Sequence, residues 1–165
     1  MILTASRPSE ALCARWDEII PDKKLWVVPA TRMKGAEPHA VPLCAEALRV
    51  LGRQKLVQTG DSVFPGGGGS PLSYSAFATA PAKAGIDAAC PHGWRSVFRR
   101  WAGDIGEVPR ELAEAALAHS LGSVEGAYWR GSRAVERRRE IMERYSQWLT
   151  GEGAQVLAFP TPKKA

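Results

Sequence analysis

The sequence predicts an α+β fold that is mostly α-helical and contains a small antiparallel β-sheet or hairpin. Most of the chain carries apolar residues at the i, i+3, i+4 spacing of helices that bury one face. The main β-rich stretch lies early, in residues 24–43, where two apolar runs flank a turn signal. At 165 residues, the chain is long enough for one domain with a substantial core.

The first expected element is a helix near the chain start. Ser6 can cap this helix, Pro8 lies in its first turn, and Leu12, Trp16 and Ile19 provide its apolar side. Proline is tolerated in a first helical turn because its missing N–H would have no partner there.

The next segment predicts a β-hairpin. Its β-rich runs, residues 25–28 and 41–43, are separated by the turn residues Lys34 and Gly35. His39 is one residue of a polar strand, and we interpret it as structural or exposed.

Two helices with a glycine-rich loop between them are expected next. Residues 45–57 form the first, with an apolar side made of Leu48, Leu51 and Leu56. Residues 66–69 are four glycines without the Gly-Lys-Ser/Thr of a P-loop, so we interpret them as a surface loop. Ser73 caps the second helix, which runs towards Lys83.

The second half of the chain predicts three longer helices. Pro91 opens one with a buried stripe of Trp94, Val97, Phe98 and Trp101. Pro109 opens the next, which extends to His119. Ser132 caps a basic helix that extends to Leu149, with an outer face expected to hold Arg133, Arg137, Arg138, Arg139 and Arg144. Residues 151–165 are expected to be a disordered tail.

Composition narrows the class of protein only slightly. A formal net charge of +5 is compatible with a polyanionic partner but common among other proteins. Three cysteines without a CxxC pair argue against a zinc ribbon or a dithiol redox site. No apolar run approaches the roughly 20 residues of a membrane span, and we expect a cytoplasmic protein.

Polar residues at regular intervals mark a candidate phosphate site. His92 and Arg95 are three residues apart and share a helix face, and Arg99 follows one turn later. His119 and Tyr128 follow in the next two helical patterns. Cations that are held in place by a packed helix suit a phosphate ligand.

Taken together, these residues resemble the catalytic domain of the tyrosine recombinase (phage integrase) family. The resemblance covers residues 4–151 and looks most like the integrases of prophages and genomic islands. It is carried by Thr4-Ala-Ser-Arg7-x-x-Glu10, Arg32-Met-Lys34 with Val41-Pro-Leu43, His92-Gly-x-Arg95, Leu117-Ala-His119, and Tyr128. It implies that residues 1–150 form a tyrosine recombinase catalytic domain.

The resemblance implies one role for each of six residues. Arg7 and Arg95 would clamp the scissile phosphate, Lys34 would protonate the leaving 5′ oxygen, His92 would assist proton transfer, His119 would hydrogen-bond the phosphate, and Tyr128 would be the nucleophile. The implied product of cleavage is a 3′-phosphotyrosyl link to DNA. The implied partners are double-stranded DNA at attachment sites, other protomers in a synaptic tetramer, and host or phage accessory factors that bend DNA or set directionality.

General chemistry fits this division of roles. Guanidinium groups stabilise the charge that a phosphodiester gains under attack. A tyrosine with a pKa of about 10 needs help to lose its proton at neutral pH. We expect no cofactor and no metal, because the cations suffice and the sequence shows no Asp/Glu cluster. No ATP is expected either, since the covalent intermediate retains the energy of the phosphodiester.

Two departures from the family and two alternative functions stay open. The N-terminal DNA-binding domain is not in the sequence, from which we expect a shortened chain with weak, salt-sensitive DNA binding. Pro8 directly after Arg7 can alter how Arg7 is presented. The alternatives are a non-catalytic DNA-binding remnant and a topoisomerase that shares the chemistry. Tyr74 and Tyr145 are competing nucleophiles that we interpret as structural.

Overall fold

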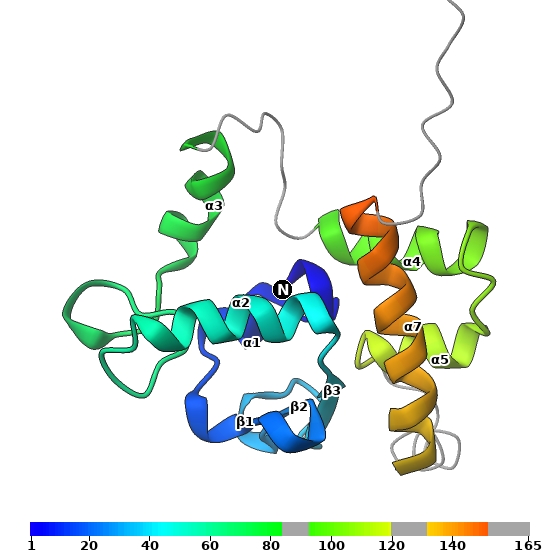
Figure 1. The fold of residues 1–165 in the computed structure, drawn as a ribbon, viewed down its shortest axis with the longest axis horizontal. Helices are drawn as coiled ribbons and strands as arrows, with labels where there is room; N and C mark the ends of the chain where they lie inside the picture. Colours follow the sequence, from blue (N-terminus) through cyan, green and yellow to red (C-terminus); the bar gives the residue numbers. More distant parts are fainter. Residues whose placement is uncertain (84–92, 120–131, 152–165) are drawn as a thin grey trace, which may run out of the picture.

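The computed structural model of the chain describes residues 1–83, 93–119 and 132–151. Two groups of elements lie side by side (Figure 1). The first contains a three-stranded sheet with helices α1 and α2, and the second contains α4, α5 and α7. The predicted mixture of many helices and one small antiparallel sheet is confirmed.

The sheet has the strand order β1-β2-β3 and is antiparallel throughout. Its strands are β1 (Ile19–Ile20), β2 (Leu25–Val28) and β3 (His39–Pro42). The predicted hairpin is therefore confirmed, with Trp26 opposite Val41 in the register. On its other side Trp26 lies opposite Ile19 of β1, a strand that the sequence did not predict.

The first helix is shorter than expected. α1 (Pro8–Leu12) begins after Arg7, and Arg7 rather than Ser6 is its N-cap residue. The predicted continuation to Ile19 is wrong because the following backbone pairs elsewhere. The Val63 N–H donates to the Ala14 carbonyl at 2.8 Å, and this pairing replaces the bonds of a longer helix.

The remaining helices begin within two residues of their predicted starts, but α5 ends at Ala116 instead of the predicted His119, because Ala118 adopts a left-handed φ of 50°. These helices are α2 (Ala45–Leu56), α3 (Tyr74–Lys83), α4 (Gly93–Asp104), α5 (Arg110–Ala116) and α7 (Ser132–Thr150). Ser73 caps α3, since its Oγ accepts the Ala76 N–H at 3.2 Å. Leu56 was expected on a buried face but is 86% exposed at the end of α2.

Each group of elements has its own apolar core. The first core lies between the sheet, α1 and α2 and includes Trp26, Val28, Val41 and Val63. The second lies between α4, α5 and α7 and includes Phe98, Trp101, Leu117 and Tyr145. Ala5 belongs to the second core although it lies only a few residues before α1, so the N-terminal segment contacts both groups.

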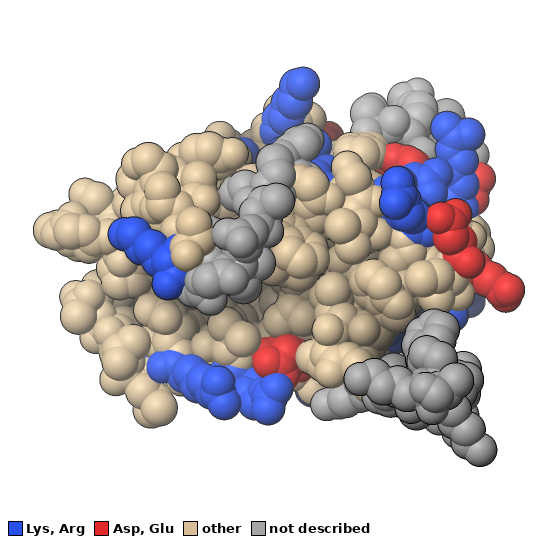
Figure 2. Space-filling model, turned by 90° about the horizontal axis from the view of Figure 1, so that it is seen from above, with Lys and Arg blue, Asp and Glu red and all other residues tan. Residues whose placement is uncertain are grey.

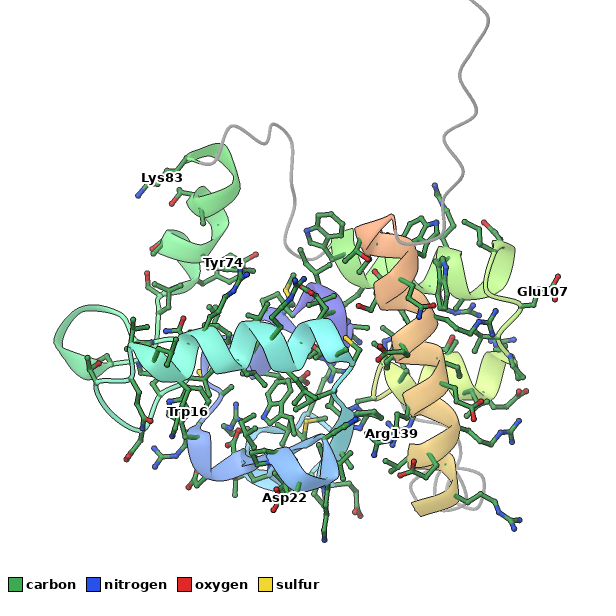
Figure 3. The ribbon with its side chains drawn as sticks, in the orientation of Figure 1. Trp16, Asp22, Tyr74, Lys83, Glu107 and Arg139 are labelled. Carbon is green, nitrogen blue, oxygen red and sulfur yellow. The ribbon has the colours of Figure 1, made fainter. Side chains whose placement is uncertain are left out.

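Helix α7 joins the two groups through polar contacts. Arg139 reaches from α7 towards the sheet (Figure 3) and donates to the carbonyls of Lys23 and Lys24 at 3.0 and 3.1 Å. Glu143 accepts the Ala45 N–H at the start of α2. The expectation that Arg138 faces outward is wrong, because Arg138 is only 2% exposed and packs towards β3 and α5.

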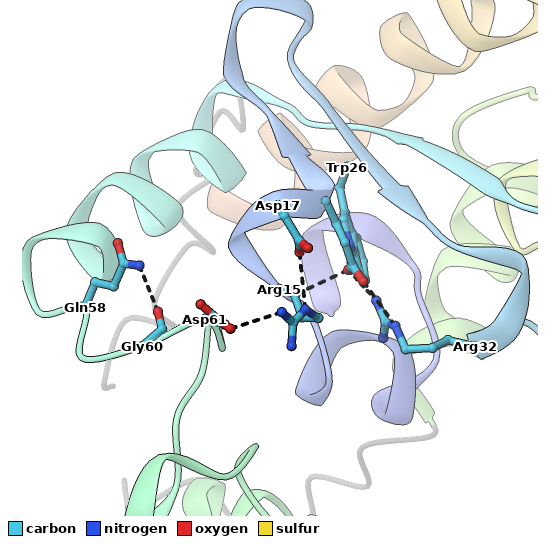
Figure 4. Close-up of polar contacts among 8 residues, drawn as sticks. Arg15, Asp17, Trp26, Arg32, Gln58, Gly60 and Asp61 are labelled. Carbon is cyan, nitrogen blue, oxygen red and sulfur yellow. Dashed lines mark hydrogen bonds and ion pairs between the residues drawn. The ribbon is translucent and has the colours of Figure 1, made fainter.

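A buried carboxylate holds β1 and β2 in place beside α1. Glu18 accepts the Trp26 Nε1–H at 3.0 Å and pairs with Arg32 (Figure 4). The Nη1 of Arg32 also donates to the Glu10 carbonyl. Arg15 pairs with Asp17 and Asp61 on the exposed side of the same region. Within the described ranges, no helix is long and apolar enough to cross a bilayer.

Candidate functional site at the end of helix α5

The side chain of Arg95 lies at the boundary between the two cores. It is 7% exposed and comes from the first turn of α4. Its Nη1 donates to the Ala5 carbonyl at 2.5 Å, and its Nη2 donates to the Leu117 carbonyl at 2.7 Å. Burial, followed by the positive charge of Arg7, lowers the pKa of Arg95. From the sequence we expected Arg95 on a helix face that presents cations to a ligand, but the structure shows that most of this side chain is buried.

Arg7 approaches the same place from the other core. Its Nη1 pairs with Glu10 Oε1 at 2.7 Å, and its Nη2 donates to the Ala118 carbonyl at 3.3 Å. Glu10 is 3% exposed, and its Oε2 also accepts the backbone N–H of Arg7 at 2.8 Å. Glu10 therefore compensates the charge of Arg7 and fixes the start of α1, with Pro8 in the first turn.

His119 lies between a carboxylate and a guanidinium. Its Nδ1 is 2.5 Å from Glu114 Oε2, and its Nε2 is 3.0 Å from Arg95 Nη2. Because a guanidinium can only donate, Nε2 must be the acceptor, and the ring proton lies on Nδ1 towards Glu114. The side chain is 46% exposed, so an incoming ligand can reach it.

Glu114 links His119 to a second arginine. Its Oε1 accepts the Arg99 Nε–H at 2.8 Å. Burial acts to raise the pKa of Glu114, but hydrogen bonds from His119 and Arg99 outweigh burial and lower it. Glu114 is consequently ionised at neutral pH and holds the imidazole in one orientation. Arg7, Arg95 and His119, with their partners Glu10 and Glu114, are called the arginine cluster below.

The structure brings together three of the six predicted site residues. Arg7, Arg95 and His119 meet at the end of α5. Lys34 lies exposed in the turn between Arg32 and β3, and among the described residues no hydrogen bond or ion pair joins it to the cluster. His92 and Tyr128 lie outside the described residues.

The two competing tyrosines occupy different environments. Tyr145 is fully buried between Phe98 and Trp101, and burial raises its pKa to about 12. A buried phenol with a raised pKa is poorly suited to attack a phosphate. Tyr74 is 56% exposed at the first residue of α3.

The sequence analysis gave no role in the site to three residues that surround this cluster, although Glu10 was part of the family motif. Glu10 lies three residues after Arg7, a spacing at which side chains meet on a helix, whereas the five residues between Glu114 and His119 predict no such pair. His39 was interpreted as structural or exposed, yet its ring hydrogen-bonds the Ala116 backbone close to Arg138, Glu10 and Arg7. No local pattern predicts that contact.

The basic side chains visible on one face of the molecule are scattered (Figure 2). On the face seen in Figure 2, the Lys and Arg side chains lie mostly towards the margins, and the described centre is largely uncharged. The net charge of +5 is thus not displayed there as one continuous stripe.

Solved structures with this arrangement of elements are tyrosine recombinases. XerA recombinase has a TM-score of 0.61 at 19% identity, over 89% of this chain and 55% of that chain. An R225K variant of the Tn1549 transposon integrase, in complex with circular intermediate DNA, has a TM-score of 0.57 at 13% identity, over 87% of this chain and 55% of that chain. The fold is therefore that of a tyrosine recombinase catalytic domain.

Sequence comparison narrows this class further. The profile of the phage integrase family matches residues 1–133, and the chain belongs to this family. The prophage integrase IntA of Escherichia coli K12 is 37% identical over 147 residues, which cover 86% of this chain and 35% of IntA. The integrase of Enterobacteria phage P4 is 33% identical over 168 residues, which cover 90% of this chain and 38% of that integrase. The chain spans little more than a third of these relatives.

Proposed function

We propose that the chain is the catalytic part of a site-specific DNA recombinase that integrates or excises a prophage or another mobile element. It cleaves and rejoins DNA through a 3′-phosphotyrosyl intermediate on Tyr128. The single observation that carries this proposal is the meeting of Arg7 and Arg95, from two different cores, beside the imidazole of His119. A phosphodiester has two non-bridging oxygens, and two fixed guanidinium groups with one imidazole suit them.

The contacts of the arginine cluster support a role in the transition state. Backbone carbonyls and Glu10 hold the two guanidinium groups in place before any ligand arrives. Groups that are fixed in advance need no reorganisation when charge develops on the phosphate, and they stabilise the transition state most strongly. A hydrogen bond from His119 to the phosphate requires a proton on Nε2, because in the free protein Nδ1–H donates to Glu114 and Nε2 accepts from Arg95.

The proposed chemistry balances without an outside reagent. The phenolic oxygen of Tyr128 forms a bond to phosphorus, and the bond from phosphorus to the 5′ oxygen breaks. The phenol loses its proton with the help of His92, and the leaving 5′ oxygen receives a proton from Lys34. Attack by a 5′ hydroxyl of the partner strand reverses these steps and releases Tyr128. Lys34 must approach the cluster when DNA binds, because it lies in an exposed turn of the free protein.

DNA and further copies of the protein are the proposed partners. The related Tn1549 integrase is described in complex with circular intermediate DNA, and XerH recombinase is described bound to a palindromic difH substrate. A synaptic tetramer and accessory DNA-bending or directionality factors complete the proposal, with the protein on the nucleoid of a bacterial cytoplasm. Residues 1–150 are the proposed catalytic unit, and the tail predicted for residues 151–165 lies, apart from Gly151, outside the described residues.

A suicide substrate tests the proposed nucleophile. The substrate is a nicked duplex with the sequence at the ends of the genetic element that encodes the chain, so that a short strand is lost on cleavage and religation fails. We expect a covalent protein–DNA adduct that survives denaturing electrophoresis and that Tyr128→Phe abolishes. Tyr74→Phe is the matched control and should retain the adduct, because Tyr74 lies on α3 rather than in the arginine cluster.

Each other outcome points to a different function. An adduct that survives Tyr128→Phe contradicts the assignment of the nucleophile. Binding of the duplex without any adduct favours a non-catalytic DNA-binding remnant. Relaxation of supercoiled DNA without sequence preference favours a topoisomerase.

A further inference from the structure

The last turn of α5 is held by basic side chains from four separate elements. In each of the four consecutive residues 115–118, the backbone is in contact with one of these side chains. These pairs are Ala115 with Arg138 of α7, Ala116 with His39 of β3, Leu117 with Arg95 of α4, and Ala118 with Arg7 before α1. The last carbonyls of a helix lack intrahelical partners and carry the negative end of its dipole, so cationic and N–H donors are stabilising there.

The backbone of this turn is strained. The Ala118 N–H donates to the Ala115 carbonyl at 3.2 Å, and the His119 N–H donates to the Glu114 carbonyl at 3.0 Å. These are the two bonds of a Schellman motif, which places its penultimate residue in the left-handed region. That residue is Ala118, with a φ of 50°, where glycine is the usual choice. An alanine stays in this conformation only if surrounding contacts hold it there.

His119 follows directly after this strained residue. The position of its imidazole relative to Arg95 therefore depends on how firmly the turn is held. Arg7 and Arg95 already belong to the arginine cluster, whereas His39 and Arg138 have no assigned role. These two side chains hold the earlier half of the turn, at Ala116 and Ala115.

The burial of Arg138 needs a structural explanation. It is 2% exposed, and no ion pair with a carboxylate is found for it among the described residues. Burial of an unpaired guanidinium costs free energy. Its bonds go to carbonyls, at 3.3 Å to Ala115 and at 3.4 Å to Ala134 in its own helix. These contacts connect α7 and the end of α5.

We propose that His39 and Arg138 are positioning residues of the recombinase site, which hold the strained last turn of α5 so that His119 and Arg95 are aligned for a phosphate. The inference rests on the proposed function, since the alignment matters for phosphate chemistry. Neither residue touches the phosphate in this proposal. They act through the Ala115 and Ala116 backbone on His119, so their loss should affect the chemical step more than DNA affinity.

Matched substitutions separate positioning from general stability. Arg138→Met and His39→Leu remove the two donors, and His39→Gln keeps a side-chain N–H. Arg139→Met is the control for Arg138→Met, because Arg139 is the next residue of α7 and also donates to backbone carbonyls, but at Lys23 and Lys24 of the sheet. The four proteins and the wild type are compared under conditions where each is folded.

Two readouts are needed. The first is the rate of adduct formation on the suicide substrate at saturating DNA, together with the DNA affinity. We expect Arg138→Met and His39→Leu to lower that rate by about 10- to 100-fold, the range for a small misplacement of catalytic groups, with little change in affinity. His39→Gln should recover most of the rate, and Arg139→Met should leave it within about twofold of wild type.

The second readout does not require catalysis. NMR of the His119 imidazole, without DNA, should show loss of the single Nδ1–H form in Arg138→Met and His39→Leu but not in Arg139→Met. Unchanged His119 signals together with an unchanged rate overturn the inference, and so does an equal loss in Arg139→Met. If the wild type forms no adduct, the proposed function fails, whereas the His119 signals still report whether the turn is held.

Discussion

At the scale of single residues, His39 shows how the fold changes the chemistry of a side chain. Burial, with the nearby charge of Arg138, lowers its pKa to about 4 from its usual value of 6.5, although Glu10 and the Ala116 backbone act in the opposite direction. The positive charge of Arg7 also lowers the pKa of His39. The imidazole is neutral at neutral pH, so one ring N–H is available to donate to the backbone.

The lowered pKa of His39 predicts a loss of stability in acid. Between pH 6.5 and 4 the unfolded chain binds a proton at His39 that the folded protein does not, so the free energy of unfolding falls as the pH falls. The loss is at most about 3 kcal/mol, from about 1.4 kcal/mol for each unit of pKa. Urea denaturation at pH 7 and pH 5 measures it.

His39→Gln is the comparison for this measurement. Its stability should fall less between pH 7 and pH 5, because glutamine does not titrate while Glu10 and the other carboxylates remain. An identical fall in both proteins would contradict the assignment of the loss to His39.

At the scale of elements, the end of α4 shows how one glycine permits close packing. Gly106 follows α4 and lies against the Trp101 ring, which is 3% exposed within an aromatic group with Phe98 and Tyr145. A Cβ at Gly106 would lie 3.0 Å from the nearest atom of that ring. A Cβ at Gly103, inside the same helix, would have nothing nearer than 3.8 Å.

These two glycines predict opposite effects of the same substitution. Gly106→Ala should destabilise the protein by about 1–3 kcal/mol, because Trp101 has little room to move within the packed core. Gly103→Ala should be neutral or stabilising by up to about 1 kcal/mol, since alanine favours a helix over glycine. Thermal and urea denaturation of both variants measure the difference, and equal effects would contradict the packing argument.

At the scale of the whole molecule, the arginine cluster also connects the two cores. Arg95 bonds Ala5, which precedes α1, and Leu117, which ends α5. Helix α7 connects the two cores a second time, through the hydrogen bonds of Arg139 and Glu143. The site is formed where the two cores meet, so folding of both is required before Arg7 and Arg95 are side by side.

Because Arg95 connects the two cores, its substitution should lower the free energy of unfolding strongly. Arg95→Met leaves two carbonyls without their charged donor and should cost about 2–4 kcal/mol in the free energy of unfolding. Arg99→Met, one turn further along α4, removes a side chain that is 38% exposed, and it should cost no more than about 1 kcal/mol. Chemical denaturation compares the two, and a loss of similar size in both would show that Arg95 does not join the cores.

Local signals were sufficient for much of the fold and for part of the site. Ser73 at the start of α3, Pro109 before α5 and the left-handed Gly151 after α7 act within a few residues, so the sequence alone predicts these helix ends. The order of the motif residues indicated the family, which the comparison confirmed. The roles of Lys34, His92 and Tyr128 remain predictions.

Periodicity and capping are local properties, so the amino-acid pattern was enough to predict most helices, the hairpin and the order of the family's residue types. Three features became clear from the folded chain alone: α1 ends at Leu12, Arg138 is buried, and His39 contacts the end of α5. Each of these depends on a partner far away in the chain, such as the residues around Val63 or the carbonyls of α5, and no local pattern encodes the distance between such partners.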